Sequence, residues 1–558
     1  MVLPEASAGS WSNADEFMVE NVPVSEHSNS TGTAGSAWAP LRHPIFRMLW
    51  FAQTGSNLGG WMQTVAAQWF LVQTGAGSAV VAWVQAASLL PVLFLSLFAG
   101  VLADRFDRRG WLLTMNIVSA ALALVLTVLS AVGALGAPSL LLMTFLLGSS
   151  AALTAPAWQA IQPDLVPHDE IPAAAALGGI TVNAARAVGP AIAGVLVAWS
   201  GPTSVFAINA VSFAGVVFAL LRWPRPERPK RAWNEPLGEA IVAGIRYLVA
   251  GPVVRRLLLR SLMFAVPASA LWSLLPSAAD GVLHLGAAGY GLLLGMLGIG
   301  SILGAVLMPL ITRRLSSSAV LGVSAAVFAF GTLCIAWWPL VIVVPVLLVA
   351  GVAWTATLTT LNAAMQLSAA PWVRARAISV YLLALLGGQG VGAVLWGAVS
   401  SVAGVSMTLV IAAGLLGLVA LSVLLLPLHP NTGRLDRSIQ PYCAPEPQLV
   451  FEPEPTDGPL TVSVSYRVEP EKEAGFLVAM SILRDSRRRT GAAGWTLERS
   501  ADAAGSFREE FRVRSWGEYS AARTERWTGQ DAAVMARVLE NAEVVTESHE
   551  FVVRMPRR

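Results

Sequence analysis

The chain has 558 residues, of which 55% are hydrophobic and only 13% are charged, and its mean hydropathy is +0.61. Soluble proteins carry about a quarter of their residues as charged side chains, so this composition excludes a protein that is soluble throughout. The net charge of +3 is too small to indicate nucleic-acid binding, and two cysteines exclude a disulfide framework.

The charges are unevenly distributed along the chain. Residues 46–427 hold 27 charged residues in 382 positions, whereas residues 428–558 hold 38 in 131. We therefore expect a lipid-embedded part followed by a small soluble domain. Residues 1–43 contain five acidic residues, and no lysine or arginine occurs before Arg42. This is the reverse of the basic start of a signal peptide and predicts a disordered cytoplasmic tail.

Twelve stretches are apolar over the ~20 residues that a helix needs to cross a bilayer. They lie at 46–73, 78–103, 111–134, 138–161, 171–199, 203–222, 256–280, 288–312, 318–338, 340–366, 373–400 and 404–427. The predicted fold is an all-α polytopic membrane protein with two six-helix halves, 44–222 and 256–427. A basic cytoplasmic linker at 223–255, with an amphipathic helix, would join the halves.

The positions of arginine and lysine predict the orientation. The loops after the second, sixth, eighth and tenth stretches carry these residues, whereas loops 74–77, 135–137, 200–202, 281–287 and 401–403 carry none. Because basic loops stay in the cytoplasm, both termini are expected there.

An internal repeat supports two parallel halves. Four pairs of identical residues are separated by 204 positions: Gly100 and Gly304, Arg109 and Arg313, Gln162 and Gln366, Pro167 and Pro371. Chance recurrence in a biased composition is the alternative, but all four pairs fall at equivalent ends of the predicted spans.

Two motifs resemble a known family. Residues 100–109, Gly-Val-Leu-Ala-Asp-Arg-Phe-Asp-Arg-Arg, resemble the loop signature of the major facilitator superfamily. Residues 186–194, with Gly189, Pro190 and Gly194, resemble the helix-packing motif of its drug-exporting antiporters. The stretches 46–62 and 156–167 are similar to the branch that includes the enterobactin exporter. The resemblance implies a proton-coupled secondary transporter.

The loop after the second stretch is the candidate gate, formed by Gly100, Asp104, Arg105, Arg108 and Arg109. In the family this aspartate faces the start of the eleventh span, here near Arg374. The alternative is that the arginines only set topology. The family usually has glycine where this chain has Asp107, and we expect the aspartate to accept the left-handed turn. No acidic residue lies near a predicted bilayer midplane, so proton coupling is implied by the resemblance alone.

Candidate substrate or coupling residues are polar or aromatic side chains inside the spans. Arg186 is far from both ends of its span, where lipid exposure costs about 2.5–3.5 kcal/mol, so it should face a cavity or a partner. A structural bond to carbonyls is the alternative. Asn57, Trp61 and Gln68 share one face with Gln53 and Thr64. Further candidates are Asn183, Trp272, Asn362 and Gln389, and Trp354, Tyr381 and Trp396 could complete an aromatic pocket with Trp272. Helix packing is the alternative for each.

The soluble part begins with a Pro-rich linker, 428–459, which we expect to be stiff and extended. Residues 460–558 read as strand 460–467, helix 470–490, strands 494–500 and 507–514, one helix near 516–540 and strand 543–554. The order βαββαβ predicts a small α+β ferredoxin-like cytoplasmic domain. The stretch 506–519 resembles the small antibiotic-biosynthesis monooxygenase fold, which implies dimerisation through the sheets.

We therefore expect an exporter of a siderophore, an antibiotic or another bulky small molecule, working by alternating access in a bacterial cytoplasmic membrane. Its partners would be the substrate and the lipid bilayer, without nucleic acid, metal or cofactor. Two alternatives remain: a membrane-anchored monooxygenase-like enzyme, and a ligand sensor that uses the soluble tail.

Overall fold

The computed structural model describes residues 38–224, 251–429 and 449–552, together with 432, 436–440 and 442. For nine residues within these ranges only the backbone is described: Leu97, Gly100, Val101, Ala103, Asp104, Arg105, Pro163, His168 and Ala375. The predicted N-terminal tail up to residue 37 and positions 225–250, with the predicted amphipathic helix, lie outside the described residues.

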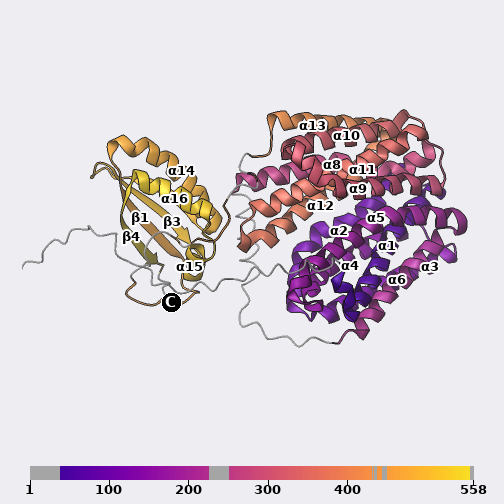
Figure 1. Ribbon diagram of the computed structural model, residues 1–558, viewed down its shortest axis with the longest axis horizontal. Helices are drawn as coiled ribbons and strands as arrows, with labels where there is room; N and C mark the ends of the chain where they lie inside the picture. Colours follow the sequence, from indigo (N-terminus) through magenta and orange to yellow (C-terminus); the bar gives the residue numbers. More distant parts are fainter. Residues whose placement is uncertain are drawn as a thin grey trace, which may run out of the picture.

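The apolar part folds into two groups of long helices that lie side by side (Figure 1). The first group is α1 (Pro44–Gln73), α2 (Ser78–Arg105), α3 (Arg108–Ala131), α4 (Ala137–Ile161), α5 (Ile171–Ser200) and α6 (Pro202–Arg222). The second is α8 (Pro252–Gly281), α9 (Ala287–Arg314), α10 (Ser317–Trp337), α11 (Leu340–Ser368), α12 (Arg374–Ala403) and α13 (Val405–Leu425). Short 3-10 turns, η1 (Ala39–Arg42), η2 (Gln162–Leu165), η3 (His168–Glu170) and η4 (Pro371–Val373), lie at helix ends.

The first and last residues of each long helix lie within four positions of the ends of the corresponding predicted span. Among the described residues, eleven helices are long and apolar enough to cross a membrane, and α1 is not one of them. Its polar face, which includes Gln53, Asn57 and Gln68, lowers its hydropathy.

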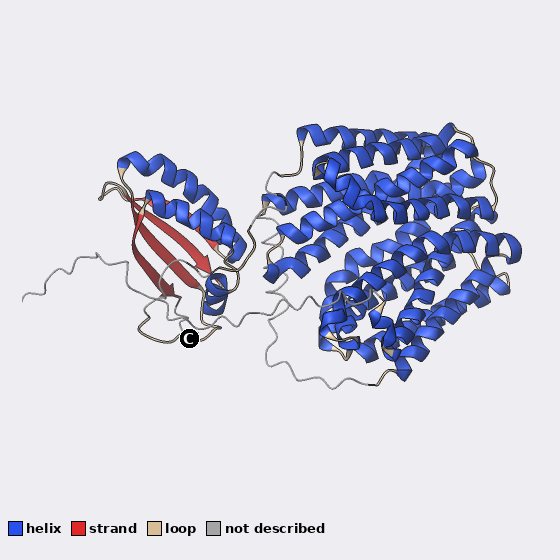
Figure 2. Ribbon diagram, in the orientation of Figure 1, coloured by secondary structure: helices blue, strands red, loops and turns tan. Residues whose placement is uncertain are grey.

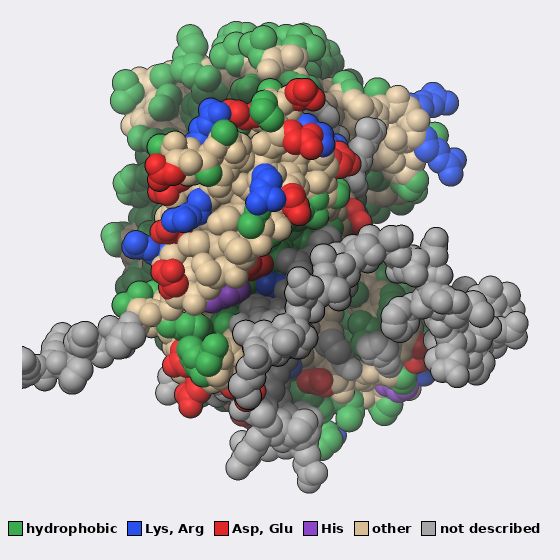
Figure 3. Space-filling model, turned by 90° about the vertical axis from the view of Figure 1, so that its left-hand side faces the viewer, with side chains coloured by type: hydrophobic (Ala, Val, Ile, Leu, Met, Phe, Trp, Pro, Cys, Tyr) green, Lys and Arg blue, Asp and Glu red, His purple; other side chains and the backbone are tan. Residues whose placement is uncertain are grey.

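The outer surface of the helix groups is rich in exposed apolar side chains, such as Val211 at 71% and Leu425 at 85% exposure. Figure 3 shows this apolar surface behind the charged face of the soluble tail.

Glycine forms the same tight connection in both groups. Gly201 joins α5 to α6 with φ of 77°, and Gly404 joins α12 to α13 with φ of 78°. Only glycine adopts this region without steric cost, so the chain can reverse direction between two long helices in one residue. The two turns occupy equivalent positions in the two groups.

The tail is a four-stranded antiparallel sheet covered on one face by helices (Figure 2). Its elements are β1 (Leu460–Arg467), η5 (Pro470–Lys472), α14 (Glu473–Thr490), β2 (Ala493–Arg499), β3 (Ser506–Val513), α15 (Trp516–Thr524), α16 (Gly529–Asn541) and β4 (Glu543–Phe551). The strand order is β2-β3-β1-β4, and β1 pairs with both β3 and β4. Alternate residues of β1, from Leu460 to Tyr466, are buried, as expected for a sheet covered on one face.

The prediction of one helix near 516–540 was wrong, because the segment forms α15 and α16. Ser515 caps the first helix through the amide of Glu518. The carboxylate of Asp531 accepts hydrogen bonds from the amide and hydroxyl of Thr528, which starts the second helix. Each segment therefore has its own N-terminal cap, which makes two helices of the one that we predicted.

The described part of the Pro-rich linker pairs with the tail. The amide of Gln440 donates to the carbonyl of Trp527 at 3.0 Å, and the amide of Gly529 donates to the carbonyl of Ser438 at 2.9 Å. Ile439 forms an isolated antiparallel bridge with Thr528. Residues 436–440 thus pair with the tail at the break between α15 and α16, a contact that the prediction of a stiff, extended linker did not include.

Candidate functional site

A cavity of about 970 Å³ lies within the first helix group. Its walls come from the first two thirds of α1, the middle of α2 and α3, the last half of α4, and the first half of α5. Of the predicted site residues, Asn57, Trp61 and Asn183 line it, as do Gln53 and Thr64 from the polar face of α1.

The cavity wall is mostly apolar but carries several hydroxyl groups, and most of these are already bonded within their own helices. Thr64 donates to the carbonyl of Gly60 at 3.1 Å, Ser88 to that of Val84 at 2.9 Å and Thr154 to that of Ser150 at 2.6 Å. This i to i−4 bond satisfies a hydroxyl in a helix and leaves only its lone pairs for a ligand. Several lining residues were not predicted from the sequence: Trp50, Gln85, Asn116, Trp158, Gln159 and Gln162. Polar side chains inside otherwise apolar spans were the feature of the sequence that could have identified the amides among them.

Arg186 lies behind the cavity wall and is stacked on Trp61. Its guanidinium carbon is 5.5 Å from the centroid of the Trp61 ring, a cation–π distance. Its Nε atom is buried, and no hydrogen-bond or ion-pair partner of Arg186 is found among the described residues. The backbone carbonyls that we considered as structural partners are therefore not bonded to it.

An aromatic cluster continues from Trp61 into the second helix group. The ring of Trp61 is 6.2 Å from that of Trp272, which is 5.3 Å from that of Trp354. Phe264 and Phe328 pack on Trp354 at 5.6 and 5.5 Å. The indole Nε1 atoms of Trp272 and Trp354 are buried without a hydrogen-bond partner. Among the described residues, this cluster and Arg186 therefore include buried donors without a partner in both helix groups.

Other predicted site residues do not join this cluster. Tyr381 bonds to the carbonyl of Leu358, and Trp396 donates to that of Val266 at 2.7 Å, so neither belongs to the aromatic pocket that we expected. Gln68 accepts a hydrogen bond of 2.5 Å from the hydroxyl of Tyr290. Asn362 accepts from Gln366 at 2.6 Å, and Gln389 is buried against its own helix.

The two helix groups touch closely along α5–α9 and α2–α12. A Cβ atom on Gly194 would lie 2.8 Å from the Cα atom of Gly291, so the backbones of α5 and α9 are in contact. A Cβ atom on Gly189 would lie 2.9 Å from Cβ of Trp61. The Gly189-Pro190-Gly194 motif therefore brings α5 against α1 on one side and α9 on the other. The hydroxyl groups of Ser78 and Ser400 lie 2.8 Å apart between α2 and α12.

The candidate gate is described only in part, because only the backbone of Gly100, Asp104 and Arg105 is described. Arg108 donates to the carbonyl of Ala160 at 2.7 Å and lies 3.8 Å from the carboxylate of Asp164. Arg109 donates to the carbonyls of Leu220 and Leu221. Both arginines thus tie α3 to helix ends of their own group.

The expectation of a left-handed Asp107 was wrong. This residue has φ of −59°, and its carboxylate accepts a hydrogen bond of 3.0 Å from the amide of Gly110. An N-cap needs extended backbone and an acceptor side chain, and aspartate supplies both. The aspartate therefore starts α3 and does not imitate a glycine turn.

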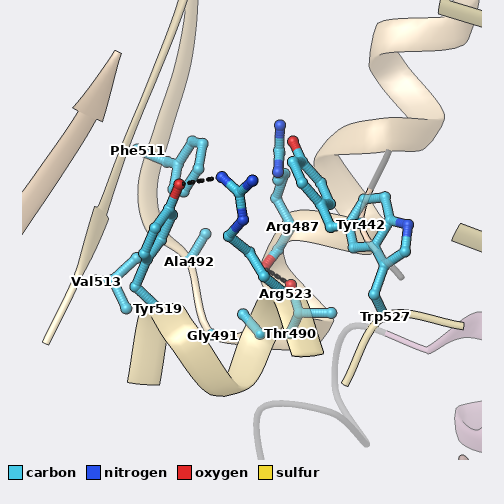
Figure 4. Close-up of a pocket in the computed structure, with 11 residues that line it drawn as sticks. Tyr442, Arg487, Thr490, Gly491, Ala492, Phe511, Val513, Tyr519, Arg523 and Trp527 are labelled. Atoms are coloured by element: carbon cyan, nitrogen blue, oxygen red, sulfur yellow. Dashed lines mark hydrogen bonds between the residues drawn. The ribbon is translucent and has the colours of Figure 1, made fainter. Parts of the chain in front are cut away.

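The tail contains a small second pocket of about 20 Å³, which has room for about one water molecule. The ring of Tyr442 of the linker contacts two arginines, Arg487 and Arg523, whose guanidinium carbons are 5.4 and 4.5 Å from its centroid (Figure 4). Arg487 also forms a buried bidentate ion pair with Glu509. Burial and the negative charge of Glu509 raise the pKa of the neighbouring Tyr466 well above its usual value.

The side chains of the tail pocket are arranged for packing. Within the described ranges, no group of three or more His, Cys, Asp or Glu side chains could hold a metal ion. The arginines that line the pocket already contact its aromatic rings. The arrangement is that of a packed core around a charge pair.

Comparison with known families accounts for nearly the whole chain. Residues 35–553 match the family model described as Transmembrane secretion effector, within the major facilitator superfamily. The chain belongs to this family of transporters. The family and the relatives described below are transporters, not enzymes. This chain is therefore a multi-pass membrane transporter.

Individual relatives are more distant. The Staphyloferrin A transporter of Staphylococcus aureus is 25% identical over 289 residues, covering 51% of this chain and 72% of the relative. The multidrug efflux pump Tap of Mycobacterium tuberculosis is 26% identical over 399 residues, covering 66% and 89%. The enterobactin exporter EntS of Shigella boydii is 31% identical over 224 residues, covering 39% and 51%.

Solved structures share the fold. An inward-facing, unoccupied bacterial homologue of the human lysosomal transporter Spinster matches with a TM-score of 0.54 at 16% identity, over 70% of this chain and 99% of that structure. The nucleoside transporter NupG matches with a TM-score of 0.55 at 13% identity, over 69% and 99%. These similarities establish the arrangement of helices and nothing about the substrate.

Proposed function

We propose that this transporter is an exporter that works by alternating access and that the structure corresponds to its inward-facing state. One observation carries the proposal: the cavity lies at one end of the helices, and the two groups pack together toward the other. The cavity walls include residues 46–64 of α1, η2 and residues 174–183 of α5. The contacts between groups involve later parts of α1 and α5, such as Gln68 and Gly194.

The orientation rests on the basic loops. Arg108 and Arg109 mark the end of the bundle at which the cavity lies, so that end would face the cytoplasm, with both termini. In this proposal α1 is a twelfth membrane span despite its polar face. Its polar residues face a cavity and not lipid, so the cost of exposing them to hydrocarbon does not arise. Two six-helix halves, 44–222 and 256–427, then form the transport unit.

The substrate would be a siderophore, an antibiotic or another bulky compound. Relatives named as siderophore transporter, enterobactin exporter and multidrug pump support this class. A cavity of about 970 Å³ lies at the upper end of the range for ligand sites and has room for a large molecule. Proton coupling is proposed from the family, as is a gating role for Asp104 with Gly100 and Arg105.

The tail is proposed to be a ferredoxin-like domain with a structural or regulatory role. Its element order and its sheet order β2-β3-β1-β4 support that fold. The guanidinium of Arg526 lies 4.9 Å from the ring of Trp372 in η4, so the tail contacts the start of α12. A dimer formed through the open face of the sheet would meet charged residues such as Arg508 and Glu510, and polar pairs would have to hold it.

A disulfide across the packed end tests alternating access. In a variant without Cys334 and Cys443, Ser78→Cys with Ser400→Cys places two thiols where hydroxyl groups now lie 2.8 Å apart. Oxidation should lock this end, abolish efflux of a fluorescent substrate from cells, and be reversed by reductant. Full efflux with the cross-link formed would contradict the proposal.

The matched control joins two helices of one half. Ser130 of α3 and Thr203 of α6 lie 2.6 Å apart at the same end of the bundle. Ser130→Cys with Thr203→Cys should cross-link equally well and leave efflux intact, because these helices move together. A sensor or a membrane-anchored enzyme would show no efflux in any of the variants.

A further inference from the structure

We propose that the cavity selects uncharged and anionic, oxygen-rich aromatic compounds and discriminates against cations. The inference refines the substrate class of the proposed exporter, and it rests on that proposal only in taking the cavity ligand as the transported molecule. Two independent features carry it: the absence of charged side chains among the described residues of the cavity wall, and the position of Arg186.

The described residues that line the cavity include no aspartate, glutamate, lysine, arginine or histidine. A cation that leaves water for such a site loses its hydration and gains no carboxylate in return. The wall offers amides instead. Gln85, Gln159 and Gln162 line the cavity and have no hydrogen-bond partner among the described residues. Their NH₂ groups can donate to carbonyl, phenol or carboxylate oxygens of a ligand.

Arg186 adds a positive potential to this neutral wall. It contacts Trp61, which lines the cavity, and the described residues provide it with no acidic partner. A unit charge acting over about 10 Å at an effective dielectric constant of about 20 changes the affinity for a charged ligand by more than tenfold. The change strengthens the binding of anions and weakens that of cations.

Aromatic rings give the cavity its preference for flat ligands. Trp50, Trp61 and Trp158 line its wall, and tryptophan offers a large apolar face for stacking. Without Arg186 these rings would also attract cations through their electron-rich faces. Because the guanidinium of Arg186 already lies over Trp61, that ring is engaged by a cation of the protein itself.

Two probes of nearly the same shape and opposite charge test the proposal. Binding of tetraphenylborate and of tetraphenylphosphonium to the purified full-length chain in detergent can be measured by calorimetry. The informative quantity is the dissociation constant of tetraphenylphosphonium divided by that of tetraphenylborate. This ratio is compared between variants. Non-specific partitioning of each probe into detergent is the same for all variants and cancels in that comparison.

We expect the wild-type chain to bind tetraphenylborate at least tenfold more tightly than tetraphenylphosphonium. Arg186→Gln should reduce this preference by about a hundredfold, because loss of the charge weakens binding of the anion and strengthens binding of the cation by about tenfold each. Asn57→Asp, which places a carboxylate on the wall and leaves Arg186 in place, should reduce it similarly. The matched control is Arg222→Gln, because Arg222 also stacks on an aromatic ring, that of Phe218 at 4.7 Å, but does not line the cavity. Its ratio should equal that of the wild type.

A wild-type preference for the cation would overturn the proposal, as would a ratio that neither Arg186→Gln nor Asn57→Asp changes. If the Arg186→Gln protein does not fold, the ratio measured for Asn57→Asp tests the proposal by itself. The outcome is separable from that of the cross-linking experiment. Binding selectivity can fail in a chain that transports by alternating access, and it can hold in a chain that does not transport.

Discussion

The contact between α5 and α9 offers the most direct test of how the two halves are held. A methyl group on Gly194 would lie 2.7 Å from the carbonyl oxygen of Ala287 and 2.8 Å from Cα of Gly291. Both are backbone atoms, so neither can rotate away, and the two helices must separate. Overpacking of this kind costs about 1–3 kcal/mol.

This cost falls on one conformation only. The two helices belong to different halves, so the overlap disappears once the halves part at this end. A difference of 1–3 kcal/mol shifts such an equilibrium by about 5–150-fold. We therefore expect Gly194→Ala to move the transporter away from the described state and to slow efflux, although alanine favours a helix over glycine by about 1 kcal/mol.

The assay uses Ser400→Cys, in the chain without native cysteines, as a reporter of the packed end. Ser400 is only 4% exposed, so a membrane-impermeant maleimide added outside the cell should label this position slowly. Labelling should become at least about fivefold faster with Gly194→Ala. Gly215→Ala on α6 is the control, because its added methyl meets no atom within 4 Å. Equal labelling rates and wild-type efflux in Gly194→Ala would refute the reasoning.

Two further predictions concern the tail and are read from its transition in scanning calorimetry of the full chain. Glu509→Gln leaves Arg487 buried without its ion pair, at a cost of about 3–5 kcal/mol, and should lower the midpoint by more than about 10 °C; an unchanged midpoint would contradict the assigned pair. Burial opposes ionisation of Glu547, but hydrogen bonds from His549 and Tyr519 and the charge of Arg523 lower its pKa to about 2. Because this lies below the unfolded value of about 4.3, its ionisation stabilises the tail above that pH. The contribution should disappear as the pH falls toward 2, and Glu547→Gln should lack this part of the acid sensitivity.

The sequence by itself determined the helices and their order. Backbone polar groups cannot remain unpaired in lipid, so apolar stretches of sufficient length must be helices, and their ends followed to within four residues. Helical periodicity also placed Gln53, Asn57, Thr64 and Gln68 on one face of α1. In the tail, alternation and turn residues predicted every strand, because local patterns determine which face of a strand is buried.

Only the tertiary structure decided which neighbour each face meets. On the polar face of α1, Asn57 lines the cavity, whereas Gln68 bonds to Tyr290 of the other half. Of the four predicted aromatic residues, Trp272 and Trp354 came together, while Tyr381 and Trp396 did not. Periodicity specifies a direction on one helix, but a pocket needs the distances between helices, which depend on packing far along the chain.

The place of Arg186 shows the same division. Its rarity inside an apolar span predicted a cavity or a partner, since lipid would not tolerate the charge. That its partner is the ring of Trp61 depends on Gly189, one turn further along α5. A Cβ atom there would lie only 2.9 Å from Cβ of Trp61, so the missing Cβ lets α5 pack closely on α1. The sequence contains both residues, but only the packed helices bring them into contact, because the approach depends on the shapes of two surfaces at once.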